Sequence, residues 1–150
     1  MTPLVWHERS FDDLTTRELY AILALRASVF VVEQRCVYQD VDGADAAARH
    51  VWATRATDDR DEIVAYLRIV PAGAKYAEAS IGRVVVAPGA RGGGLARELM
   101  QRGIAAAGAA VRIGAQAHLE SFYRSLGFVP VSGVYDEDGI PHVEMLRAAT

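Results

Sequence analysis

The chain has 150 residues, of which 51% are hydrophobic, and its formal net charge at pH 7 is −3. This length suits a single domain with a hydrophobic core, and no apolar run is long enough to span a bilayer. The small net charge argues against a broad basic face, so we expect neither a nucleic acid nor a membrane as partner.

The N-terminal third of the chain predicts a strand, a helix and a long acidic loop. We expect the short strand at residues 3–8. Three side chains are candidates for the helix N-cap: Asp12, Asp13 and Thr16. Apolar residues then recur at helical spacing, which predicts a helix from about residue 15 to 32. The acidic connection over residues 36–48 is long for a small domain, and such connections are often functional.

Cysteine and histidine usage restricts the compartment and the chemistry. The only cysteine, Cys36, cannot form an internal disulfide, so a reducing cytoplasm is the expected compartment. The first 30 residues contain acidic side chains and no uninterrupted apolar segment, so we expect no signal peptide. Four scattered histidines without paired spacing argue against a zinc site, and we expect no metal.

The rest of the chain alternates predicted strands and helices. In chain order we expect strands at 50–57, 62–70 and 80–87, a helix at 93–108, a strand at 111–115, a helix at 116–126, and strands at 128–134 and 142–147. Polar turns are expected at 57–61 and 135–139, and Gly127 is typical of a residue that ends a helix. This order indicates an α/β fold in which helices cover both faces of a mixed sheet.

The stretch from residue 80 to 100 carries the strongest functional signal. A run of three valines, Val84, Val85 and Val86, predicts a buried strand. Arg91 and three glycines follow it and lead directly into a helix. The first N–H groups of a helix have no intrahelical partner and carry partial positive charge, so they can bind a phosphate. The glycines allow a ligand to approach the backbone closely, and Arg91 adds a charged donor.

Four interpretations of this loop compete. A P-loop would require Lys-Ser or Lys-Thr after the last glycine, whereas Leu95 and Ala96 follow here. A dinucleotide site would want an acidic residue about 20 residues later, and residues 108–118 contain none. A third interpretation is a glycine-rich turn that connects strand and helix and binds no ligand, which requires no additional sequence motif. The fourth pattern, Arg-x-x-Gly-x-Ala from Arg91 to Ala96, resembles motif A of the GCN5-related N-acetyltransferases (GNAT family).

A second motif follows at the expected separation. Residues 111–128 resemble motif B of the same family, Asn-x-x-Ala-x-x-Phe-Tyr-x-x-x-Gly-Phe, with Phe122 and Tyr123 in the aromatic positions. Gln116 replaces the asparagine of that motif, and Leu119 replaces its alanine. Further similarity over residues 5–147 resembles the ElaA-type branch of the family. We therefore expect residues 1–150 to form one GNAT domain, with the sheet splayed at the cofactor site.

The resemblance implies an acetyl-CoA-dependent N-acetyltransferase that moves the acetyl group directly to an amine in a ternary complex. Backbone N–H groups of the loop would hold the pyrophosphate of coenzyme A, and the strand at 84–86 would pair with the pantetheine arm. A backbone N–H near Val84 or Val85 could polarise the acetyl carbonyl. The residues expected to bind the cofactor are Val84, Val85, Val86, Arg91, Gly92, Gly93, Gly94, Leu95, Ala96 and Gln116.

Tyr123 is the expected general acid, because a phenol stays protonated at neutral pH and can give a proton to the departing thiolate. Alternatively, Tyr123 has only a structural role, as a core residue that packs on Phe122. Three residues are candidate general bases: His118, His142 and Glu33. An amine that arrives already deprotonated would need none of them.

The acceptor is expected to be a primary amine, either small or peptidyl. The acidic loop could attract it through Asp40 and Asp42 together with Glu33, although a solvated loop would show the same composition. Two rival functions remain open: a non-catalytic acyl-CoA-binding module and a nucleotide-binding regulatory domain. A homodimer is also left open.

Overall fold

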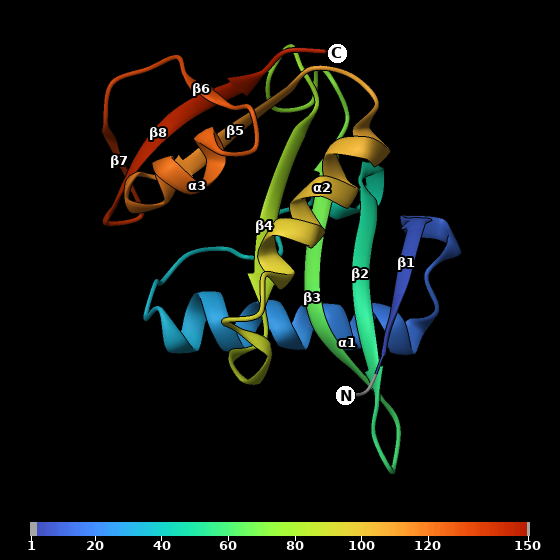
Figure 1. Cartoon of the computed structure of the whole chain (residues 1–150). Coiled ribbons are helices and arrows are strands. Elements are labelled where there is room, and N and C mark those ends of the chain that lie inside the picture. Colours follow the sequence, from blue (N-terminus) through green and yellow to red (C-terminus); the bar gives the residue numbers. More distant parts are fainter. Residues whose placement is uncertain (1–2, 150) are drawn as a thin grey trace.

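The computed structural model describes residues 3–149, which form two antiparallel sheets joined at one edge (Figure 1). The first sheet has the order β1-β2-β3-β4, with strands at Leu4–Ser10, Arg49–Ala56, Asp61–Val70 and Ser80–Val86. The second has the order β5-β8-β6, with β7 also paired to β8; its strands are Val111–Gln116 (β5), Val129–Pro130 (β6), Tyr135–Glu137 (β7) and Ile140–Arg147 (β8). A parallel bridge between Ala79 and Val111 joins them.

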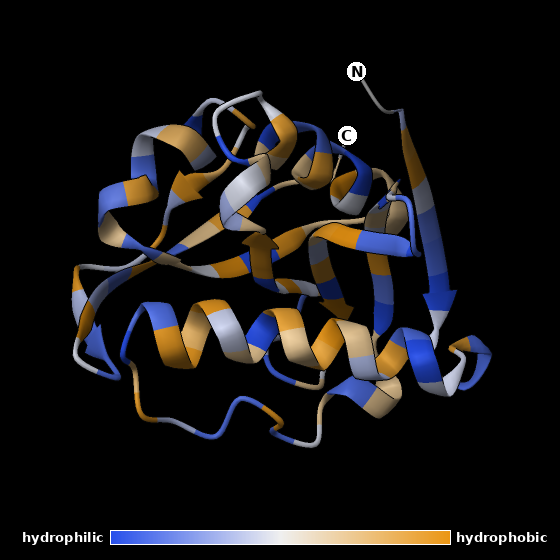
Figure 2. Ribbon diagram, turned by 90° about the horizontal axis from the view of Figure 1, so that it is seen from below, coloured by the Kyte–Doolittle hydropathy of each residue, from blue (hydrophilic) through white to orange (hydrophobic). Residues whose placement is uncertain are grey.

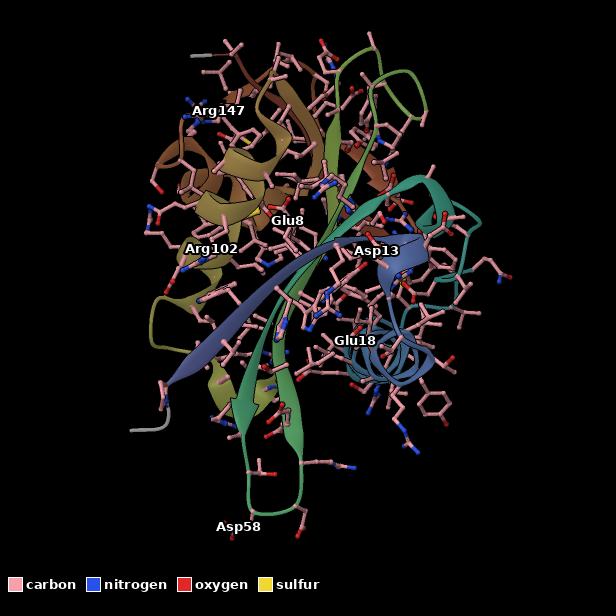
Figure 3. All side chains as sticks on the ribbon, turned by 90° about the vertical axis from the view of Figure 1, so that its right-hand side faces the viewer. Glu8, Asp13, Glu18, Asp58, Arg102 and Arg147 are labelled. Carbon is pink, nitrogen blue, oxygen red and sulfur yellow. The ribbon has the colours of Figure 1, made fainter. Side chains whose placement is uncertain are left out.

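Helices cover both faces of the strands, as the sequence predicted, although the strands form two antiparallel sheets joined by one parallel bridge. Figure 3 views α1 end-on along its axis, with Glu18 on it, and shows α2 with Arg102 on the other side of the strands. The helices are α1 (Thr16–Arg26), its π-helical continuation η2 (Ala27–Glu33), α2 (Leu95–Ala107) and α3 (Glu120–Arg124). Short 3-10 turns lie at Phe11–Asp13 (η1), Asp45–Ala47 (η3), Pro88–Ala90 (η4) and Ala117–Leu119 (η5).

Alternation along the strands divides the core into two clusters. Trp52, Tyr66 and Val85 face α1, where they pack against Ile22 and Val29. Their strand neighbours point to the opposite face and pack against α2, because successive side chains of a strand alternate between faces. Figure 2 shows α1 and η2 as one continuous rod beneath the sheet, with apolar residues at recurring positions.

The packing of α2 on the sheet depends on one glycine. A Cβ built at Gly103 would lie 2.7 Å from Cδ2 of Leu67, which is fully buried in β3. Glycine at this position therefore lets the helix approach the strand closely. This contact fixes α2, and with it the glycine loop that precedes the helix.

The first helix has the predicted extent but a different N-cap residue. Its N-cap is Thr15, whose side chain accepts from the Glu18 N–H while the Glu18 carboxylate accepts from the Thr15 N–H. The predicted caps Asp12, Asp13 and Thr16 were wrong, because the Thr-x-x-Glu capping box satisfies two backbone donors at once.

The C-terminal elements depart most from the predictions. The strand predicted at 128–134 was wrong except for Val129–Pro130; beyond it the Ser132 hydroxyl, in place of a backbone carbonyl, accepts from the Glu144 N–H at 2.9 Å. The turn predicted at 135–139 shrinks to Asp138 and Gly139, both with positive φ (53° and 82°), and strand β7 precedes it. The helix predicted at 116–126 starts later, at α3, although Gly127 ends it with φ 96° as expected. Within residues 3–149 no helix has the length and apolarity to cross a membrane.

Candidate active site

The two sheets separate where β4 and β5 diverge. Besides the bridge between Ala79 and Val111, the Arg112 N–H donates to the Ala79 carbonyl at 2.9 Å. From this point the two strands run apart, as Figure 1 shows. A cavity of about 710 Å³ lies at the divergence, and its walls come from η2, the acidic loop, β4, β5, η5, α3 and the β7–β8 hairpin.

A β-bulge shapes the β4 wall of this cavity. Tyr66 pairs with Val85 and Arg68 pairs with Gly82, so β4 contains one more residue than β3 between these pairs. Arg83 lies at the bulge with φ 51°, a left-handed conformation that costs energy for a residue with a side chain. A bulge disrupts the ladder locally, so backbone groups of β4 become available to a ligand here.

The three valines of β4 face both sides of the sheet. Val85 is buried beneath α1, whereas Val84 and Val86 are partly buried against the cluster under α2. Of the three, Val84 lines the cavity. Their side chains therefore serve mainly as core, and any contact with a ligand would run through the backbone of the strand.

The glycine loop presents an open backbone surface at the start of α2. Gly92 and Gly94 have φ values of 92° and 79°, which residues with a Cβ rarely adopt. A Cβ built at Gly92, Gly93 or Gly94 would meet no atom within 4 Å. Since α2 begins at Leu95 with no side-chain cap, its first N–H groups are left for an external acceptor. The loop therefore fits an anionic group such as a pyrophosphate.

Arg91 and Glu33, which were predicted to have separate roles, form an ion pair in this structure. Nη1 and Nη2 of Arg91 donate to the two carboxylate oxygens of Glu33 at 3.0 and 2.7 Å. Arg91 Nε also donates to the Val86 carbonyl at 3.1 Å. These hydrogen bonds from Arg91 lower the pKa of Glu33. The pair links the end of η2 to the end of β4 beside the cavity.

Tyr123 forms part of the cavity wall from α3. Its side chain is 7% exposed and packs edge-to-face on Phe122 and Phe128, with ring centroids 5.2 and 5.9 Å away. Burial raises the pKa of Tyr123 to about 12. The phenol is therefore protonated throughout the neutral range, as a proton donor must be.

The two histidines predicted as bases both line the cavity but differ in their surroundings. His118 is exposed on η5. His142 is buried on β8, opposite Gln116 of β5, and its Nδ1 lies 2.7 Å from the Ile140 carbonyl oxygen. A carbonyl can only accept, so Nδ1 carries the proton and the lone pair of the neutral ring is on Nε2. Nε2 lies 3.4 Å from the Glu137 carboxylate.

The acidic loop is held down by a buried ion-pair network. Arg26, which is fully buried, contacts Asp40 at 3.1 Å and Asp45 at 2.7 Å. Arg68 binds both carboxylate oxygens of Asp42 at 2.8 and 2.7 Å, which holds the pKa of Asp42 well below its usual range. Arg83 donates to the Asp40 carbonyl oxygen at 3.0 Å. The network therefore attaches the loop to α1, β3 and the bulge of β4.

The cavity brings together half of the residues predicted for the site. Its lining includes Glu33, Asp42, Val84, Arg91, Gln116, His118, Tyr123 and His142. The glycine loop lies outside this lining, and Asp40 is buried in the ion-pair network. Within the described chain no three His, Cys, Asp or Glu side chains are grouped as metal ligands.

Several lining residues were not predicted from the sequence, notably Lys75, Arg83 and Glu137. The sequence does contain a sign of the ion-pair network. Arg26 and Arg68 interrupt apolar helix and strand patterns, and neither has an acidic residue within the adjoining turn or strand positions. Buried charges require partners, and the acidic loop supplied a dense group of carboxylates. No comparable pattern marks Lys75 or Glu137.

Comparison with known proteins identifies the family. The chain matches the family described as Acetyltransferase (GNAT) domain over residues 26–148. Protein ElaA of Escherichia coli is 42% identical over 149 residues, covering 95% of each chain. The crystal structure of Escherichia coli ElaA superimposes with a TM-score of 0.87 at 41% identity, covering 97% of this chain and 99% of that one.

Two further solved structures extend the comparison. An acyl-CoA N-acyltransferase from Pseudomonas aeruginosa has a TM-score of 0.90 and 44% identity, covering 97% of this chain and 100% of that one. An aminoglycoside 6'-N-acetyltransferase complexed with coenzyme A shares the fold, with a TM-score of 0.65 and 17% identity over 95% of this chain and 96% of that one. The family and fold predicted from the two motifs are confirmed. This chain belongs to the GNAT acetyltransferase family and is an acyltransferase.

Proposed function

We propose that the protein transfers an acetyl group from acetyl-CoA to a primary amine, directly and within a ternary complex. One observation carries this proposal. The cavity between the diverging strands β4 and β5 has the protonated phenol of Tyr123 in its wall, and an open glycine loop precedes α2 at the end of β4. The coenzyme A in a structural neighbour supports a CoA thioester as the donor class.

Binding of the donor falls to backbone groups. The N–H groups from Gly92 to Ala96 would hold the pyrophosphate, because they combine the free donors of a helix start with the positive end of its dipole. The edge of β4 from Val84 to Val86 would pair with the amides of the pantetheine arm. Gln116, at the end of β5, would contact the cofactor from the facing wall.

Three groups of the protein would act on the reacting atoms, while the thioester supplies an activated acetyl group. The backbone N–H of Val84 or Val85 would stabilise charge on the carbonyl oxygen. As the C–N bond forms and the C–S bond breaks, Tyr123 would donate its proton to the sulfur. The proton lost by the amine would go to His142 Nε2, to His118 or Glu33, or to solvent if the amine arrives neutral.

The acceptor amine would enter from the side of the acidic loop. Asp42 and Glu33 line the cavity there, and Asp40 is buried in its pair with Arg26. These carboxylates would attract a cationic amine, even though arginines already pair with them.

Calorimetric titration with acetyl-CoA, CoA, ATP and NAD tests the donor assignment. Binding of the two CoA species alone is the expected result, whereas no binding of CoA, or a preference for ATP or NAD, would contradict it.

Replacing Tyr123 with phenylalanine separates an enzyme from an acyl-CoA-binding module that transfers nothing. We expect Tyr123→Phe to lower kcat about a hundredfold, because general acid catalysis contributes on this order, while calorimetric affinity for acetyl-CoA stays the same. Release of CoA in the presence of screened primary amines is the measurement. Unchanged turnover would remove Tyr123 as the acid, and absence of turnover in the wild-type protein with every amine would favour the binding module.

A further inference from the structure

Lys75 is the only lysine of the chain, and it lines the cavity from the loop between β3 and β4. The two arginines that line the cavity are neutralised, Arg83 by Asp42 at 3.2 Å and Arg91 by Glu33 at 2.7 Å. Lys75 Nζ instead lies 5.2 Å from the centroid of the Tyr76 ring. In the part of the chain that the structure describes, Lys75 is the cation of this cavity that has no carboxylate partner.

A carboxylate that faces the same cavity lies on the β7–β8 hairpin. Glu137 ends β7 and lines the cavity together with His142. Its contact at 3.4 Å is with the imidazole Nε2 of His142, a nitrogen that carries no proton in the neutral ring. The Glu137 carboxylate is therefore not neutralised by an arginine or a lysine among the described residues, and it can pair with a cation that enters beside His142.

Two tyrosines place Lys75 and Glu137 on one face of the second sheet. A Cβ built at Gly114 of β5 would lie 3.1 Å from the hydroxyl oxygen of Tyr135 and 3.5 Å from that of Tyr76. Tyr76 is the neighbour of Lys75, and Tyr135 is two residues before Glu137 on the same face of β7. The two hydroxyls thus meet over Gly114, and the loop bearing Lys75 packs beside the hairpin bearing Glu137.

We infer that the acceptor carries a carboxylate as well as the reactive amine, so that it is an amino-acid-type amine. This inference rests on the proposed acetyl transfer. The carboxylate of the acceptor pairs with Lys75, and its amine lies toward Glu137 and His142. The side chains of Lys75 and Glu137 are both exposed at the mouth of the cavity, so an incoming ligand can reach them, and each attracts a group of opposite charge. The two opposite charges therefore select for zwitterions over plain amines.

Matched pairs of amines test this inference. Glycine, β-alanine, 4-aminobutanoate, 6-aminohexanoate and phenylalanine are each compared with the amine that lacks the carboxylate, using acetyl-CoA as donor and mass spectrometry of the acetylated product. At least one carboxylated member should have a kcat/KM about two- to fivefold above its partner, on the order expected for one exposed ion pair. The chain length that shows the largest ratio then measures the span between the two subsites.

Variants of Lys75 and Glu137 test whether these two side chains cause the preference for carboxylated amines. Lys75→Met should raise KM for the preferred carboxylated amine about two- to fivefold, on the order expected for an exposed ion pair, and should leave its carboxylate-free partner unchanged. Lys75→Arg should keep the preference. Glu137→Gln should raise KM for both members of the pair, because both carry the amine. Arg60→Gln removes one positive charge from the β2–β3 turn, whose tip at Asp58 projects away from the sheet in Figure 3, and serves as the control.

Three outcomes overturn the inference. Equal kcat/KM within every pair would remove the carboxylate subsite. A Lys75→Met effect of equal size on both members would show a structural role for the lysine, and acetylation of the intact protein that Lys75→Met abolishes would show that the lysine is itself the acceptor. Failure of the proposed function is distinguishable, since then no amine turns over and calorimetry detects no CoA binding.

Discussion

Two loops beside the cavity were both predicted as functional from composition, and the structure shows that they differ in kind. The glycine loop makes almost no contact through side chains: a Cβ at Gly92, Gly93 or Gly94 would meet only open space. The acidic loop is attached by Arg26, Arg68 and Arg83, and its Asp40 and Asp45 are nearly inaccessible. An accessible backbone is typical of a surface that binds a ligand. Buried, paired charges are typical of a segment that stabilises the structure around the cavity.

The largest expected effect comes from breaking the attachment of the acidic loop. Arg26→Met leaves the carboxylates of Asp40 and Asp45 buried with fewer partners, so we expect a loss of about 3–5 kcal/mol in the free energy of unfolding. Urea denaturation followed by tryptophan fluorescence measures it. Arg49→Met, which removes an exposed pair with Glu8, should change the unfolding midpoint little. Similar effects of both variants would contradict the contrast between the loops.

Obstruction of the glycine loop should impair binding and leave the fold intact. Gly93 has an ordinary φ and space for a side chain, so Gly93→Val should change the free energy of unfolding by no more than about 0.5 kcal/mol. The added side chain occupies the approach to the helix start, and we expect affinity for CoA to fall about tenfold or more in calorimetry. Gly133→Val is the matched control, because Gly133 is equally open and lies on the loop after β6. Equal affinities of the two variants would exclude the loop as the binding surface.

Acid should weaken the attachment of the acidic loop in a predictable direction. The pKa of Asp42 is depressed in the folded protein by Arg68, so its contribution to stability is complete above the unfolded value of about 3.9. This contribution is lost as the pH falls below that value toward the folded pKa. Urea midpoints should therefore decline below about pH 4, and Asp42→Asn should reduce the slope. An identical slope in the variant would assign the decline to other carboxylates.

The smallest effect is expected at the Glu33–Arg91 pair. Both side chains are nearly half exposed, at 43% and 44%, and exposed ion pairs contribute little to stability. Glu33→Gln should therefore leave the urea midpoint within experimental error. Glu98→Gln, which removes the carboxylate of another exposed pair with Arg102, provides the control. A clear loss in Glu33→Gln alone would show that this pair fastens η2 to β4.

Local patterns predicted the elements well and the long-range contacts poorly. The helix through residue 32, the strands of the first sheet and the glycine loop result from periodicity and turn chemistry within short windows. The Thr15 cap was missed because Asp12, Asp13 and Thr16 were weighed as single residues, without the paired Glu18. Strand β7 was missed because its three residues look like a polar turn, and their pairing depends on β8.

In the candidate site, too, local motifs were predicted from the sequence and long-range contacts were not. Motif spacing predicted the loop and Tyr123, and both have surroundings that suit the expected roles. The pairing of Arg91 with Glu33 spans 58 positions in the sequence, and the meeting of Tyr76 with Tyr135 over Gly114 joins three separate segments. No short window contains such contacts, because they arise only when the two sheets are placed against each other.

The π-helical turns of η2 accommodate an extra residue within the first helix. In Ala27–Glu33 the hydrogen bonds skip one residue more than in an α-helix, as the bond from Gln34 N–H to the Val29 carbonyl at 2.9 Å shows. A turn of this kind takes up one extra residue without rotating the helix on either side, whereas an extra residue in a regular α-helix rotates everything after it by roughly 100°. Deleting one residue within η2 should therefore restore α-helical hydrogen bonding and leave the last residue of the helix beside Arg91. A change of length by one residue is thus better tolerated in η2 than in α1.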